Sequence, residues 1–246
     1  MSSVRQPMIL ASGLTQIASS VTCFYEANPS LPLLRRGLVE GVGTLLLMFT
    51  ATAAAALSSQ PQSNGAWALS AALAAPAALV GLIVAFGAVS GGHFNPLITF
   101  LQWLARERSS RCTLTYIGAQ TAGAMTGAWL AGEVLGLTRS ALLVPERGLW
   151  ITGEIIATAG LLVVVFGCAR SARAETGPFA VGAWLLAAAV TMPHAYVNPA
   201  LTVGALVAAG PVALSGPDVL RHVPSQFLGA LAAFGIIRAA FASRPQ

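Results

Sequence analysis

Apolar residues occur along this chain in eight blocks that polar, proline-rich or charged segments separate. A helix needs about 20 predominantly apolar residues to cross the hydrocarbon core of a bilayer. Six blocks are predicted to be membrane spans, at residues 33–57, 67–89, 113–137, 149–169, 179–192 and 219–241. The other two, at residues 97–104 and 201–209, are too short to cross, which favours re-entrant half-helices.

A loop containing the dipeptide Asn-Pro leads into each short block. Residues 91–99 read Gly-Gly-His-Phe-Asn-Pro-Leu-Ile-Thr, and residues 194–202 read His-Ala-Tyr-Val-Asn-Pro-Ala-Leu-Thr. Asparagine is a good N-cap and proline is tolerated in the first turn of a helix, so each stretch is predicted to start a short helix. One Asn-Pro is an ordinary turn signal, but two copies in matching positions of two similar halves are far more specific.

The two halves of the chain repeat. Glu40 in the first span corresponds to Glu154 in the fourth, and Gln120 in the third span corresponds to Gln226 in the last. Because each half has three spans, the second copy enters the membrane in the opposite sense, as an inverted repeat. The predicted fold is an all-α membrane protein of six transmembrane helices plus two re-entrant half-helices.

Composition agrees with this fold class, and charge adds an orientation. Hydrophobic residues make up 56% of the 246 and charged residues only 9%, against about a quarter charged in soluble domains. All 13 basic residues are arginine, and ten of them fall on one side of the predicted membrane, leaving Arg139, Arg147 and Arg221 on the other. By the positive-inside tendency, both termini are cytoplasmic. The arginine-only, alanine-rich composition favours a bacterial inner (plasma) membrane.

Several functional classes are disfavoured by what the chain contains. The net charge of +5 comes without a basic run that has interleaved aromatics, so no nucleic-acid partner is expected. Cys23, Cys112 and Cys168 have neither metal-ligand spacing nor an even number for disulfides, so they are interpreted as packing residues. No nucleophile, base and orienting group occur together, and there is no glycine-rich phosphate loop. We therefore expect no enzyme activity, no cofactor and no metal.

Two irregular loops that meet inside a bilayer indicate a pore, because such backbone is tolerated there only if it is buried in protein or lines a water-filled cavity. The positive ends of the two half-helices would point at the centre and oppose a cation or hydronium ion. Asn95 and Asn198 can each cap their own helix and present side-chain N–H donors to the lumen. Water in single file would then donate its hydrogens away from the centre, which breaks proton hopping. The pattern predicts transport of neutral molecules.

The chain resembles the major intrinsic protein family of aquaporins and aquaglyceroporins. The similar features lie at Glu40, Glu154, residues 90–99, Tyr116, Gln120 and residues 198–200. The resemblance implies a homotetramer in the lipid bilayer with one pore per subunit. The apolar blocks divide the chain into an N-terminal cytoplasmic extension (1–32), a channel domain (33–241) with repeats at 33–137 and 149–241, and a C-terminal tail (242–246).

The chain departs from the family pattern at the pore motifs and the filter. The motifs are Asn95-Pro96-Leu97, where the family has alanine third, and Asn198-Pro199-Ala200. The filter positions that the resemblance implies are Ala75 (or Pro76), Leu186, Ala189, Ala195 and Leu201. Leu201 stands where the family has its filter arginine, and Thr202 where glycerol facilitators usually have aspartate. The expected filter is wide and apolar, and would pass water with glycerol-like, urea-like or metalloid hydroxide solutes such as arsenous acid.

Three hypotheses stay open at this point. The first is the passive channel, in which Glu40, Glu154, His93 and His194 support the loops without a metal. Whether either histidine also lines the pore stays open. The second is a proton-coupled small-solute transporter that uses Glu40 or Glu154 as its proton site. The third is a non-conducting structural member of the family whose lumen Leu97, Phe94 and Leu201 would block.

Overall fold

The computed structural model describes residues 24–59, 65–138, 149–170, 174–192 and 194–241. Among these residues the secondary structure is entirely helical, which confirms the predicted all-α class. Much of the N-terminal extension and all of the tail lie outside the described residues, as do Cys23, Arg5, Arg139, Arg147, Arg173 and Arg244.

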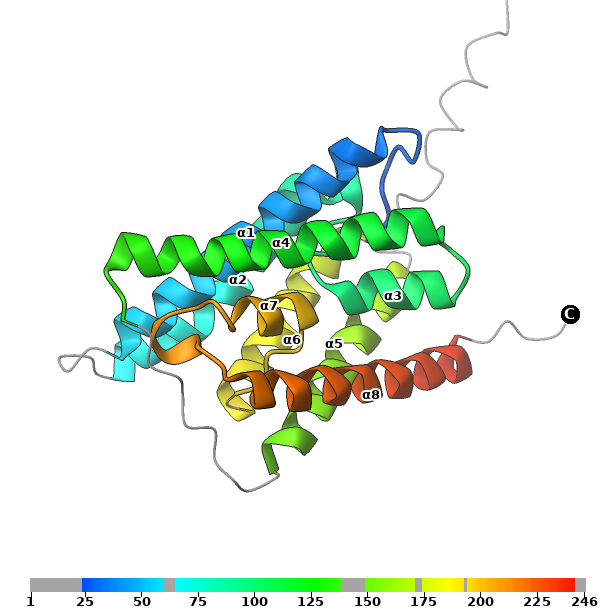
Figure 1. Ribbon diagram of the computed structural model, residues 1–246. Helices are drawn as coiled ribbons and strands as arrows, with labels where there is room; N and C mark the ends of the chain where they lie inside the picture. The colour runs from blue at the N-terminus through cyan, green and yellow to red at the C-terminus, as the bar shows by residue number, and fades with distance from the viewer. Residues whose placement is uncertain (1–23, 60–64, 139–148, 171–173, 193, 242–246) are drawn as a thin grey trace, which may run out of the picture.

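Six long and two short α-helices follow one another in the predicted order (Figure 1). They are α1 (Leu33–Ser58), α2 (Gly65–Ser90), α3 (Pro96–Leu104), α4 (Ser110–Leu135), α5 (Leu149–Ala169), α6 (Gly177–Thr191), α7 (Pro199–Gly204) and α8 (Gly216–Ala240). Two short 3-10 helices, η1 (Ala174–Thr176) and η2 (Gly210–Val212), precede α6 and α8.

Four of these helices are long and apolar enough to cross a membrane by themselves: α1, α2, α5 and α8. α4 has the same length as α1 but carries more polar residues, and α6 has only 15 residues. Both nevertheless lie inside the same bundle as the four apolar helices (Figure 1). Their neighbours in the bundle, rather than hydropathy alone, therefore account for their place in the membrane.

The second short helix is shorter than its apolar pattern predicts. The sequence favours helix over residues 201–209, but α7 ends at Gly204. A Cβ atom at Gly204 would lie 3.0 Å from the backbone of Ala124 in α4, so the chain has reached its neighbour and must turn. The amides of Leu206 and Val207 accordingly donate to carbonyls three residues back, and the last turns tighten.

The two halves pair their helices in the same way. α1 packs along α4 in the first half, and α5 packs along α8 in the second. Glycines allow both pairs to approach closely: a Cβ at Gly127 of α4 would lie 2.2 Å from the Leu45 carbonyl oxygen, and one at Gly229 of α8 would lie 2.6 Å from that of Ile155. Small residues at helix crossings are typical of membrane bundles, where backbones can then pack in contact.

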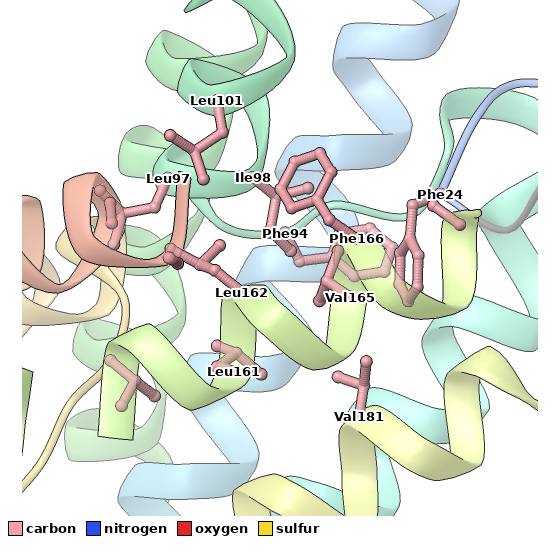
Figure 2. Close-up of a cluster of buried hydrophobic side chains, with 14 of the residues drawn as sticks. Phe24, Phe94, Leu97, Ile98, Leu101, Leu161, Leu162, Val165, Phe166 and Val181 are labelled. Atoms are coloured by element: carbon pink, nitrogen blue, oxygen red, sulfur yellow. The ribbon is translucent and has the colours of Figure 1, made fainter. Parts of the chain in front are cut away.

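The short helices α3 and α7 fill the space between the two paired layers. Both lie between α4 and α8 (Figure 1). α3 presents Leu97 and Leu101 beside α5, which contributes Leu162 and Phe166 to the same apolar cluster (Figure 2). This cluster fixes α3 in the bundle and so positions the loop that precedes it.

Candidate functional site

Each Asn-Pro asparagine caps its own short helix. The side-chain oxygen of Asn95 accepts a hydrogen bond from the amide of Leu97 at 3.0 Å, and that of Asn198 accepts one from Ala200 at 3.0 Å. Both asparagines have extended backbone, and a proline follows as the first helical residue. This is the local structure that the residue types favour.

The two asparagines also join the two loops to each other. Asn95 Nδ2 donates to the carbonyl of Val197 at 2.9 Å, and Asn198 Nδ2 donates to the carbonyl of Phe94 at 2.8 Å. Each bond uses one of the two amide hydrogens, which leaves one donor on each side chain. Both side chains line the same cavity, so the remaining donors are available to its contents.

The residue before each asparagine has a left-handed backbone. Phe94 has φ 47° and Val197 has φ 50°. This conformation is unfavourable for residues other than glycine or asparagine, and most of all for β-branched valine. Backbone strain of this kind concentrates at functional sites. Here it turns the amide of each residue toward a buried carboxylate while its carbonyl meets the opposite asparagine.

Glu40 of α1 is the carboxylate that holds the first loop. Oε1 accepts hydrogen bonds from Ser90 Oγ at 2.6 Å and the His93 amide at 3.0 Å. Oε2 accepts from the Phe94 amide at 2.7 Å and from Gln120 Nε2 at 2.8 Å. The side chain is fully buried. Its acceptor sites are therefore occupied by four donors.

Glu154 of α5 does the same in the second loop. It accepts hydrogen bonds from the amides of Tyr196 at 2.9 Å and Val197 at 2.7 Å, and from Gln226 Nε2 at 2.7 Å. His222 Nε2 lies 4.0 Å from Oε2, beyond hydrogen-bond distance, so Glu154 has three of these donors where Glu40 has four. The glutamate, glutamine and backbone-amide arrangement thus occurs twice, related by the repeat.

These contacts speak against a proton relay through the glutamates. Protonating Glu40 would turn an acceptor oxygen into a donor, and the two backbone amides and Gln120 Nε2 that face it can only donate. Hydrogen bonds that hold the loop would then be lost. Neither Glu40 nor Glu154 is among the residues that line the cavity. The geometry favours loop support over proton transfer.

The two predicted histidines both line the cavity but differ in their contacts. His93 Nε2 donates to the Phe24 carbonyl at 3.0 Å, because a carbonyl only accepts, and Nδ1 then accepts from the Thr99 hydroxyl at 2.8 Å. The backbone of His194 has φ 74°, and its carbonyl faces His222 Nε2 at 3.2 Å. In the described part of the chain, no group of three or more His, Cys, Asp or Glu side chains could hold a metal ion.

A cavity of about 530 Å³ passes both asparagines and runs between the halves of the molecule. It extends from Ser58, at the end of α1, to Phe24, just before the start of α1. Of the predicted filter positions, four line it: Ala75, Ala189, Ala195 and Leu201. No charged side chain occurs among the described residues of the wall.

The fifth span contributes Leu185 rather than the predicted Leu186 to this wall. Leu185 and Ala189 are four residues apart and so share one face of α6, whereas Leu186 is rotated about 100° away from Leu185. Pro76 lines the cavity together with Ala75.

Leu97, the departure from alanine in the first motif, lies outside the wall. Its side chain is fully buried in the apolar cluster shown in Figure 2. Phe94 belongs to the same cluster but also lines the cavity. The prolines of both motifs and Ala200 are buried as well. The larger side chain at position 97 is absorbed by the core on the side of α3 away from the cavity.

Phe24 is a cavity residue that sequence reasoning missed. It lies outside any periodic pattern, in the segment before α1, yet it is 3% exposed and lines the cavity near His93. Its carbonyl accepts from His93 Nε2 and from Gln102 Nε2 at 2.9 Å. Its backbone is left-handed, with φ 66°.

The residues after Phe24 attach this segment to the bundle. Glu26 forms ion pairs with Arg36 and with Arg108, the latter at 2.8 Å. The amide of Ala27 donates to the Ala88 carbonyl at 2.9 Å. Tyr25 donates to Glu107, and burial together with this hydrogen bond raises the pKa of Tyr25 well above its usual value. The sequence did contain a signal for this attachment: Glu26 is the only acidic residue before Glu40 and lies close to Arg35 and Arg36.

Comparisons with known proteins agree with this architecture. The sequence profile of the major intrinsic protein family matches residues 28–196. The chain is 29% identical to the aquaglyceroporin AqpS of Rhizobium meliloti over 211 residues, which cover 84% of this chain and 90% of that protein. It is also 29% identical to the glycerol uptake facilitator protein-like 6 of Lactiplantibacillus plantarum over 224 residues, covering 86% and 97% respectively.

A solved structure shows the same fold. The aquaglyceroporin from Plasmodium falciparum superposes with a TM-score of 0.67 at 18% sequence identity, covering 84% of this chain and 95% of that one. With two Asn-Pro loops joined at the centre of an inverted helical repeat, and a profile match over more than half its length, the chain belongs to the major intrinsic protein family.

Proposed function

We propose that this protein passes water together with small uncharged solutes, including glycerol-like and urea-like molecules and metalloid hydroxides such as arsenous acid. The family consists of channels rather than enzymes, and this chain is a membrane channel for water and small solutes. The proposed range of solutes follows from the uncharged residues at the filter positions.

The observation that carries the proposal is the uncharged wall of the cavity at Leu201. A filter arginine supplies several fixed donors that replace the hydration of a small polar solute. Leu201 supplies none, and the neighbouring wall is formed by the small side chains of Ala75, Ala189 and Ala195. Such a wall favours larger and less polar neutral solutes over strict selectivity for water.

The central asparagines support the exclusion of ions and protons. Asn95 and Asn198 each keep one side-chain N–H that is not used between the loops, and both face the cavity. A water molecule accepting from both would direct its own hydrogens outward. The starts of α3 and α7 add positive partial charge at the same place, although α7, with six residues, contributes less than a longer helix would.

The names of the relatives point in the same direction. One is described as an aquaglyceroporin and another as a glycerol uptake facilitator-like protein. We extend to this chain the passage of glycerol-sized molecules and, from the family resemblance, a homotetramer in which each subunit has its own conduit. Both halves of one chain line the cavity, so a conduit does not need residues from a second subunit.

Replacing Leu201 with arginine tests the proposed filter. In proteoliposomes followed by stopped-flow light scattering, the wild type should accelerate water, glycerol, urea and arsenous acid flux over empty liposomes. Leu201→Arg should slow glycerol and urea by at least about tenfold, corresponding to roughly 1.4 kcal/mol in the barrier. Water should slow less, because it is smaller.

Leu201→Met is the matched control, since it conserves volume and adds no charge. It should keep the wild-type ratio of glycerol to water permeability. Flux no faster than in empty liposomes for every solute would instead indicate a non-conducting member of the family. Uptake that saturates and collapses with a protonophore would indicate the proton-coupled transporter.

A further inference from the structure

We propose that the ends of α3, α5 and α8 form a binding site for an anionic phospholipid. A pocket of about 730 Å³ lies there. It is separate from the cavity that passes Asn95 and Asn198, because the two share no lining residue. Three arginines and three phenylalanines characterise it: Arg106, Arg170, Arg238, Phe166, Phe234 and Phe241. We call it the arginine pocket.

The arginines come from three separate elements and meet at one end of the bundle. Arg106 follows α3 in a left-handed conformation with φ 63°, Arg170 follows α5, and Arg238 is in the last turn of α8. In Figure 1 the α3–α4 connection and the end of α8 lie on the same side of the molecule. All three side chains are solvent-accessible.

The positive charge of this pocket is only partly compensated. Among the described residues, the ion pair at the pocket is that of Arg170 with Glu107, at 3.4 Å. Both side chains are 30% exposed, so the pair is screened by water. No carboxylate in the described chain pairs with Arg106 or Arg238. Two guanidinium groups are therefore available to an anion.

The inner wall of the pocket is apolar. Leu101, Phe166 and Ile237 form its buried floor, and Phe241 is half-exposed at its mouth. Two of the arginines lie against this wall, with Arg170 5.5 Å from the centre of the Phe166 ring and Arg238 5.7 Å from that of Phe234. The aromatic faces hold the guanidinium groups at the boundary between the apolar floor and water.

This combination fits a phospholipid better than a soluble anion. One guanidinium group can bind two phosphate oxygens at once. The apolar floor beneath the arginines matches the acyl chains of a lipid. Basic pockets between membrane helices bind anionic lipid head groups. An inorganic phosphate would contact the arginines but leave the phenylalanines and Ile237 unused. The topological role of arginines explains their side of the membrane but not their gathering around one pocket.

Thermal melting with added lipid tests the site without any transport measurement. The purified protein in detergent is melted with increasing phosphatidylglycerol, with phosphatidylcholine of the same acyl chains, and with inorganic phosphate. A ligand that binds the folded state raises the melting temperature with its concentration. We expect phosphatidylglycerol to stabilise the wild type at much lower concentration than the other two.

The variants assign the effect to the pocket. Arg106→Gln combined with Arg238→Gln should weaken the phosphatidylglycerol effect by at least about tenfold, because each surface arginine contributes measurably to binding anionic lipid. Arg111→Gln is the control: it removes one arginine from the same end of the bundle but outside the pocket. It should match the wild type.

Three results would overturn the proposal. They are an equal response to phosphatidylcholine, an equal response to inorganic phosphate alone, and a double variant that responds to phosphatidylglycerol as strongly as Arg111→Gln does. Melting each variant without lipid separates a lost site from a damaged fold.

Discussion

Each central asparagine depends on the strained residue that precedes it. Phe94 and Val197 direct their amides to Glu40 and Glu154 and their carbonyls to the opposite asparagine. Each buried glutamate offsets that strain with charge-assisted hydrogen bonds, which are stronger than neutral ones. At the scale of single residues, the pore centre is thus built twice from the same four parts: glutamate, glutamine, left-handed residue and asparagine.

Phe24 lines the cavity from the segment before α1, outside the repeated helices. Because its side chain lines the cavity, Phe24→Ala should raise glycerol permeability by about two- to tenfold, through a barrier lowered by up to roughly 1.4 kcal/mol. Phe24→Trp, which is larger, should lower it. Stopped-flow measurement in proteoliposomes gives both rates.

Tyr25→Phe serves as the control for Phe24, because it removes only the hydroxyl that donates to Glu107 and changes a neighbour that does not line the cavity. Its permeability should equal that of the wild type. If neither change at Phe24 alters the rates while both lower the melting temperature, Phe24 has a packing role only.

Glycines determine how closely the helices approach. α4 has a glycine at position 127 against the Leu45 carbonyl and another at position 123 against that of Gly41. Two stacked contacts of this kind bring the backbones of α1 and α4 together. The same kind of contact at Gly229 joins α8 to α5. The two halves therefore repeat in their helix packing as well as in their central residues.

Two alanine substitutions within α4 separate packing from helix propensity. Gly127→Ala should destabilise the protein by about 1–3 kcal/mol, because its Cβ would lie 2.2 Å from a carbonyl oxygen and overpack the crossing. Gly118→Ala, whose Cβ would meet nothing within 4 Å, should leave stability unchanged or raise it by up to about 1 kcal/mol. Melting temperatures in detergent compare the two. Equal behaviour of the pair would contradict the close crossing.

Most of the described arginines lie at one end of the molecule. The described arginines at the start of α1, between α3 and α4, and at the ends of α5 and α8 share one side, and Arg221 near the start of α8 lies on the other. Together with six long helices, this distribution supports the proposed orientation, with both termini in the cytoplasm. The arginine pocket would then face the cytoplasmic leaflet.

Reporter fusions measure this orientation. Green fluorescent protein and alkaline phosphatase fused after the last residue should give fluorescence and no phosphatase activity, because phosphatase folds only outside the bacterial cytoplasm. Phosphatase inserted after Thr138, at the other end of α4, should be active. The reverse pattern at the two positions would refute the proposed orientation.

Much of this architecture was already determined by the sequence. The long apolar blocks, the two Asn-Pro loops and the repeated Glu40 and Glu154 predicted the number, order and class of the helices. These features are readable because they are local: a bilayer requires a continuous apolar length, and capping depends on a few adjacent residues. Counting from Asn198 likewise predicted that Leu201 faces the pore, and Leu201 lines the cavity.

The tertiary structure alone decided which side chains face the conduit. Leu185 rather than Leu186 lines it, because one residue turns a helical side chain by about 100° and the rotation of α6 is set by its neighbours. Phe24 reaches the cavity through contacts with His93 and Gln102, far away in the chain, and α7 stops where it meets α4. The arginine pocket likewise exists only where three helix ends converge. Local patterns carry no information about such contacts, because they depend on how distant elements pack.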